Sequence, residues 1–174
     1  EGKPMADLSD KHQRVLEFFS VLPQRIVALH GSDNVAEFLL YEICNHDNFC
    51  VKKAAFFVDS PDFDTMKGVA GINTDNSFAD NHWEAPGDFS NHMSSCDFNT
   101  QVRSHDAASI HNSPYDPVKA AKMAKNLNFK NPLFYSWRMK HDNYGFVIYE
   151  QADANDLDQH MFNSLHLLSF CPVF

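Results

Sequence analysis

Basic residues are scarce in this chain. Its 174 residues include 14 lysines and arginines against 23 aspartates and glutamates, which leaves a net charge of -9. A nucleic-acid groove needs a basic stripe that replaces counterions, and an anionic membrane attracts basic segments. The charge balance therefore argues against nucleic acid and membrane as partners. It favours a soluble protein with a weak preference for cations.

Long apolar runs are also missing, and we expect no signal peptide. No stretch approaches the roughly 20 apolar residues of a spanning helix, and the opening sequence EGKPMADLSDKHQ lacks the apolar core of a signal peptide. Four cysteines are too few for a disulfide scaffold. We therefore expect reduced thiols and a cytoplasmic location. Residues 1–4 are expected to be a remnant that precedes a natural start at Met5.

Signatures of common enzyme classes do not occur in the chain. It contains no GxGxxG, no P-loop, no GxSxG and no HExxH, so it gives no support to nucleotide-binding, α/β-hydrolase or zincin classes. Catalytic groups that are distant in sequence, as in a Ser-His-Asp triad, stay compatible with this pattern.

Hydrophobic patterning predicts helices at both ends of the chain. The length suits one domain, and 44% hydrophobic residues with 21% charged residues are typical of a globular protein. Helical spacing predicts helices over 7–21, 23–30, 34–44, 117–129 and 157–168, the first two being separate or one rod kinked at Pro23. The last helix would be capped by Asp153 or Asn155, with Leu157, Met161, Leu165 and Leu168 as its apolar stripe.

Strand signals occur in the middle and towards the end of the chain. Strands are expected over 49–59 and 66–72, the second weakened by two glycines. The best β signal is a hairpin, in which 133–140 and 146–150 flank a turn that contains Gly145. These elements predict a single α+β domain with a mixed or antiparallel sheet, a C-terminal hairpin and the last helix packed on the sheet.

The segment 73–113 shows no period that indicates a regular element. Either it contains short strands around 82–83 and 101–103, or it covers a functional site. The chain has 16 phenylalanines, and buried rings such as Trp83, Phe89 and Phe98 can anchor an irregular segment. We expect this segment to be ordered and to border the site.

Part of this segment, 81–111, gathers side chains that bind metals. Histidine and cysteine are preferred ligands of zinc, and histidine with carboxylate suits zinc or iron. The predicted metal ligands are His82, His92, Cys96, His105 and His111, with Asp59 or Glu84 as the catalytic base or a further ligand. A bound zinc or other divalent metal would activate water for hydrolysis. The more common situation for such histidines is a hydrogen-bonded loop.

Three other patterns carry less information. Cys44, His46 and Cys50, with His30 upstream, could bind a soft metal, although free cysteines are commonly small core residues. Asp59, Asp62 and Asp64 could hold Mg²⁺ or Ca²⁺, or could form an Asp-Pro turn. Lys119, Lys122 and Lys125 form a cationic stripe that could meet phosphate, an acidic partner or a second copy, or could face solvent.

Two functional hypotheses follow from these patterns. The first is a soluble metal-binding domain that uses the residues of 81–111, with hydrolysis as its candidate reaction. The second is a non-catalytic domain that binds a small molecule or another protein, with a homo-oligomer as one option. The excess of phenylalanine, together with Trp83 and Trp137, supports the second, because aromatic side chains line pockets and interfaces.

Overall fold

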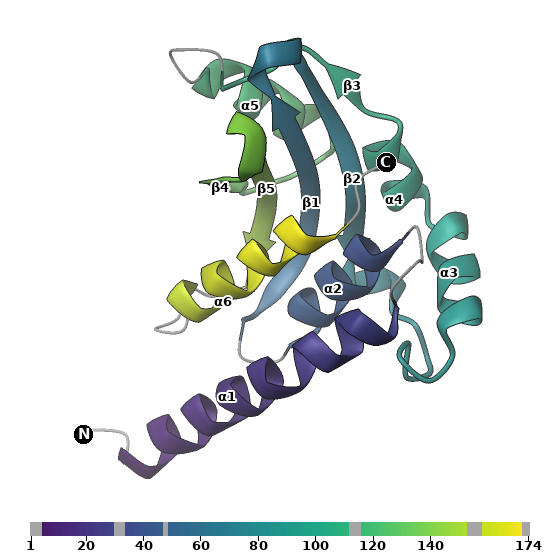
Figure 1. Cartoon of the computed structure of the whole chain (residues 1–174), viewed down its shortest axis with the longest axis vertical. Coiled ribbons are helices and arrows are strands. Elements are labelled where there is room, and N and C mark those ends of the chain that lie inside the picture. The colour runs from purple at the N-terminus through teal and green to yellow at the C-terminus, as the bar shows by residue number, and fades with distance from the viewer. Residues whose placement is uncertain (1–4, 30–33, 47–48, 112–115, 153–157, 172–174) are drawn as a thin grey trace.

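A five-stranded antiparallel sheet forms the centre of the molecule, as the computed structural model in Figure 1 shows. The order of its strands is β3-β2-β1-β5-β4. The strands are β1 (Val51–Ser60), β2 (Thr65–Asn73), β3 (Asp106–Ala107), β4 (Leu133–Arg138) and β5 (Tyr144–Gln151). Two hairpins, β1–β2 and β4–β5, meet where β1 pairs with β5. The predicted α+β fold with a C-terminal hairpin is confirmed.

Six α-helices surround this sheet in the described residues, which are 5–29, 34–46, 49–111, 116–152 and 158–171. The helices are α1 (Met5–Ala28), α2 (Val35–Cys44), α3 (Pro86–Ser95), α4 (Asp97–Arg103), α5 (Pro117–Asn126) and α6 (Asp158–Leu165). Short 3-10 turns cover Pro61–Phe63, Thr74–Asn76, Lys140–Asp142 and His166–Phe170. None of these helices is long and apolar enough to cross a bilayer.

Alternation along β1 divides the core between the two faces of the sheet. Ala54 and Phe56 belong to one buried cluster, whereas Ala55 and Phe57 belong to the other. Both faces are covered because the strand is apolar on both sides, as its continuous apolar run predicts. The sequence AAFFV thus places β1 at the centre of the sheet.

Each face of the sheet is covered by its own helices. Buried side chains of α1, α2, α3 and α6 share the cluster that contains Phe56. Buried side chains of α4 and α5 share the cluster that contains Phe57. The predicted stripe of the last helix is confirmed for Met161, Leu165 and Leu168, which are buried. Leu157, the predicted caps of that helix, and residues 1–4 lie outside the described residues.

The first helix is one rod that contains Pro23. Val15, Phe18 and Leu22 are buried on one side of it, at the spacing of a single helical face. Of the two sequence alternatives, the continuous rod is therefore the one that forms. Figure 1 shows its N-terminal end extending away from the sheet.

The prediction that 73–113 is irregular was wrong for the residues that form α3 and α4. β2 extends to Asn73, and α3 and α4 occupy 86–103. Helix α3 begins with Pro86 in its first turn, where proline is favoured. Each helix buries one apolar pair four residues apart, Phe89 with Met93 and Phe98 with Val102. Helices this short show too few apolar positions for a period to stand out.

Candidate functional site

A hollow lies between α5 and the β4–β5 hairpin. Helix α5 begins at Pro117, and the side chain of Asp116 accepts hydrogen bonds from the N–H groups of Val118 and Lys119 at 3.0 and 3.1 Å. Aspartate is a favoured capping residue, and proline is favoured in the first turn that follows it. It fixes the start of α5 above the last two strands of the sheet, and the first turns of α5 therefore form one wall of the hollow.

The hollow has a volume of about 360 Å³ and mainly aromatic and aliphatic walls. Its lining residues are Pro117, Ala120, Phe134, Tyr135, Ser136 and Phe146. Phe134 remains 38% exposed although its ring stacks on Phe146, with 6.1 Å between ring centroids. This volume lies within the usual range of ligand sites, roughly 300–1,000 Å³. The sheet therefore offers an open apolar surface at this end.

A buried carboxylate–imidazole pair lies beside the same aromatic residues. Asp59, at the end of β1, is fully buried, and its Oδ2 lies 2.5 Å from Nδ1 of His111. The same oxygen accepts the backbone N–H groups of Ile110 and His111 at 3.1 and 3.0 Å. The imidazole stacks on Tyr144 at 4.3 Å and meets Phe146 edge-on at 6.0 Å. Phe146 thus touches both the pair and the hollow.

The surroundings of Asp59 favour its ionised form. Burial opposes ionisation, but hydrogen bonds from His111 and Ser109 outweigh it and lower the pKa of Asp59. Its other oxygen, Oδ1, is buried and has no hydrogen-bond partner within the described residues. Carboxylates that orient an imidazole in this way occur in acid–base sites. The contacts of Asp59 also hold residues 109–111 against the sheet.

The other predicted metal ligands lie in separate environments. His82 is buried against α2, with Nε2 3.1 Å from Oε2 of Glu42, and Trp83 donates its Nε1–H to the same oxygen at 2.8 Å. Although burial opposes ionisation of Glu42, hydrogen bonds from His82 and Trp83 lower its pKa. Glu84, the second predicted base, is exposed on the turn before α3. Glu42 therefore fixes this turn on α2.

His92, on α3, lies beside Cys96, the residue that caps the C-terminal end of this helix, as their spacing of four residues predicts. Nε2 of His92 lies 3.7 Å from Sγ of Cys96 and 2.9 Å from the carbonyl oxygen of Asn76. Burial, together with the charges of Asp97 and Glu37, raises the pKa of Cys96. A thiol whose pKa is raised is a poor nucleophile and a poor metal ligand at neutral pH.

His105 lies on the sheet face that also carries Phe57. The two rings meet edge-on with 5.3 Å between centroids, and the carbonyl oxygen of His105 accepts the N–H of Gly68 at 3.0 Å. Burial lowers the pKa of His105, against the opposing effect of Asp106. The imidazole is therefore held in its neutral form, and its Nε2 has no hydrogen-bond partner in the described part of the chain.

Nowhere in the described residues do three or more metal-binding side chains converge on a common point. Cys44 is a buried core residue, as is common for a free thiol, and His46 packs on Phe49. Asp64 accepts the N–H of Ser109 at 3.2 Å, so it joins Asp59 in holding one loop. His30 lies outside the described residues. The three helix lysines, Lys119, Lys122 and Lys125, are exposed.

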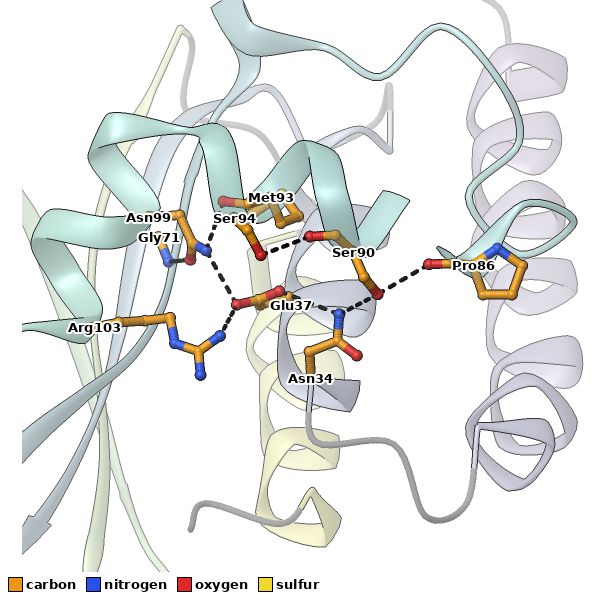
Figure 2. Close-up of polar contacts among 9 residues, drawn as sticks. All are labelled: Asn34, Glu37, Gly71, Pro86, Ser90, Met93, Ser94, Asn99 and Arg103. Atoms are coloured by element: carbon orange, nitrogen blue, oxygen red, sulfur yellow. Dashed lines mark hydrogen bonds and ion pairs between the residues drawn. The ribbon is translucent and has the colours of Figure 1, made fainter. Parts of the chain in front are cut away.

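A buried polar network that the sequence did not reveal joins α2, α3, α4 and β2 (Figure 2). Glu37 is 2% exposed, and its Oε1 lies 2.5 Å from Nη1 of Arg103. Asn99 donates to the same oxygen at 3.0 Å, and its own Oδ1 accepts the N–H of Gly71 at 2.9 Å. Asn34 links Glu37 to Ser90 at the other end. The Asn34–Glu37 spacing, which resembles a capping box, was its only sequence signal.

Comparison of the chain with protein-family models, with curated proteins and with solved structures finds no match.

Proposed function

We propose that this protein is a binding domain whose ligand occupies the hollow between α5 and the β4–β5 hairpin. The observation that supports it is the combination of volume and lining: about 360 Å³, bordered by Phe134, Phe146 and Pro117. Apolar clefts of this size with a few polar groups are the usual setting of ligand sites. Ser136 and the backbone of β4 supply the polar groups here.

Surrounding residues also favour binding at this place. Phe134 is 38% exposed, so burying it under a ligand removes apolar surface from water, at roughly 25 cal/mol per Å². Phe146 is buried and is fixed by its contacts with His111 and Phe57. A rigid floor with an exposed rim lets a ligand gain burial without reorganising the core.

The test is a titration with 1-anilinonaphthalene-8-sulfonate, a planar apolar anion whose fluorescence rises on burial. We expect the folded protein to bind it, and Phe134→Ser to weaken binding roughly tenfold, the change that about 1.4 kcal/mol of lost stacking and burial gives. Near-ultraviolet circular dichroism on the same samples checks that both proteins keep their tertiary packing.

Phe63→Ser is the matched control. Phe63 is 82% exposed on the turn between β1 and β2, so it undergoes the same chemical change away from the hollow. Equal loss of dye binding in Phe63→Ser and Phe134→Ser, or no binding to the folded protein, would contradict the proposal.

A second candidate function is acid–base or metal-assisted hydrolysis at the Asp59–His111 pair. It is favoured by the 2.5 Å contact and by the buried Oδ1 of Asp59, since a carboxylate that orients an imidazole prepares it for proton transfer. Zinc or another divalent metal would supply water activation if it bound here. Elemental analysis of protein purified without added metal tests the metal part, and a substoichiometric metal content that chelation does not change would end it.

A further inference from the structure

The backbone groups at the two edges of the sheet differ in how far they are paired. At the β2 edge, β3 pairs with Met66 and Lys67, and further along the N–H groups of Gly68 and Gly71 donate to His105 and Asn99. At the other end, β4 pairs with β5 along its whole length. Within the part of the chain that the structure describes, no further strand pairs with the outer edge of β4. Such an edge presents N–H and C=O groups that can pair with another chain.

The hollow lies over the face of the sheet that β4 and β5 form. One wall comes from α5, through Pro117 and Ala120, and the other comes from β4 and Phe146. Phe134 and Ser136 are two residues apart, so they point to the same face of the sheet. A segment that paired with β4 would also alternate its side chains, and every second one would lie on the face of the sheet that carries the hollow. A groove between an edge strand and a helix thus suits an extended peptide.

The positive charge of α5 and β4 favours an acidic peptide. The segment 117–140, which forms α5 and β4, contains six cations and no aspartate or glutamate, whereas the whole chain has a net charge of -9. The cations are Lys119, Lys122, Lys125, Lys130, Arg138 and Lys140. All of them are exposed. Arg138 is paired with Asp142, just beyond the segment, so the attraction rests on the five lysines. An acidic ligand would therefore be attracted to this end of the molecule and repelled from the remainder.

We propose that the hollow receives an extended acidic segment of a partner protein, which pairs with β4 as an additional strand and buries alternate apolar side chains against Phe134 and Phe146. The proposal rests on the proposed function, because the same hollow holds the ligand. Backbone pairing supplies register, the hollow selects apolar side chains at alternate positions, and the lysines select acidic residues between them.

The probe is the peptide EVEVEVEV-amide with fluorescein on its N-terminal amine, and its binding is followed by fluorescence anisotropy. Two matched peptides separate the parts of the proposal. One replaces every Glu by Lys, and the other carries N-methyl groups at alternate amides and so cannot pair with a strand edge. We expect the acidic peptide to bind, both controls to bind at least roughly tenfold more weakly, and rising salt to weaken the acidic peptide.

Protein variants place the binding at this edge. The double variant Lys122→Glu/Lys125→Glu is expected to weaken the acidic peptide roughly tenfold, whereas Lys11→Glu, a charge reversal at an exposed position on α1, should leave it unchanged. Phe134→Ser should weaken the acidic peptide as it weakens the dye. Equal effects of the two charge reversals would overturn the proposal.

The dye and the peptide together distinguish failure of this inference from failure of the proposed function. Dye binding without peptide binding leaves the proposed function standing and ends this inference, whereas loss of both ends both. If the lysine peptide binds as tightly as the acidic peptide, the charge part of the proposal is refuted. If the N-methylated peptide binds as tightly as the acidic peptide, the strand-pairing part is refuted. A concentration-dependent dimer in light scattering that is lost in Phe134→Ser would identify a second copy as the occupant and would overturn the assignment to a partner protein.

Discussion

The β2 end of the sheet is closed, whereas the β4 end is open. At the closed end α4 lies so near β2 that a Cβ added to Gly68 would come within 1.7 Å of the carbonyl oxygen of Val102. Asn99, which is 1% exposed, uses its side chain to satisfy the N–H of Gly71. At the open end, Phe134 is 38% exposed beside a hollow of about 360 Å³.

We therefore expect the closed end to contribute mainly to stability and the open end mainly to binding. At the closed end the buried side chains of Glu37 and Asn99 have hydrogen-bond partners, and breaking one of these bonds costs the desolvation of the group left behind. Substitutions on exposed surface away from such features change stability by only about 0.5 kcal/mol. The closed end should therefore tolerate little change, whereas the open end can vary its side chains to suit a ligand.

The largest effect is expected for Gly68→Ala. The added methyl group meets backbone rather than a flexible side chain, so α4 must move away from β2, at a cost of about 3 kcal/mol in the free energy of unfolding. Urea denaturation measures this change. Gly87→Ala is the control, because no atom lies within 4 Å of its added Cβ, and in helix α3 it should stabilise by about 0.5–1 kcal/mol. Similar losses in both variants would refute the close approach.

Asn99→Ala tests the polar network at the closed end. The change removes the acceptor of Gly71 N–H and a donor to Glu37, and it should lower the free energy of unfolding by about 2 kcal/mol. Ser136→Ala at the open end removes a hydroxyl from an exposed position and should change stability by less than about 0.5 kcal/mol. If Ser136→Ala cost as much as Asn99→Ala in the same denaturation assay, the contrast between the ends would fail.

A smaller, pH-dependent effect is expected for Asp59→Asn, which alters the Asp59–His111 pair beside Phe146. Because the pKa of Asp59 is lowered in the folded protein from its ordinary 3.8, ionised Asp59 stabilises the fold above that value, and this contribution is lost as pH falls through the folded pKa. The variant should lose about 1–2 kcal/mol near pH 7. Its stability should approach that of the wild type below about pH 4. A gap that stays constant from pH 7 to pH 3 would contradict this assignment.

The sequence predicted those elements whose signals are local. Asp116 and Pro117 mark the start of α5, and the alternation from Leu133 around Gly145 marks the hairpin. In contrast, α3 and α4 were missed, because each buries only one apolar pair and their polar residues, such as Asn99, serve partners far along the chain. Such partners leave no period or spacing in the sequence.

For the candidate site, the residues were visible but their grouping was not. Asp59 and His111 were both selected from the sequence, yet 52 positions separate them, and only the packing of 109–111 on the end of β1 joins them. The histidines of 81–111 suggested one shared site because they are close in sequence. The folded chain places His82, His92 and His105 against α2, Asn76 and Phe57 respectively.

By itself, the sequence determined the α+β class, the central position of β1 and the cationic character of 117–140, because composition and periodicity are local properties of the chain. Only the tertiary structure decided which edge of the sheet is closed, which histidine meets Asp59, and where the hollow lies. These features depend on contacts between residues far apart in sequence, and such contacts follow from how the helices pack on the two faces of the sheet.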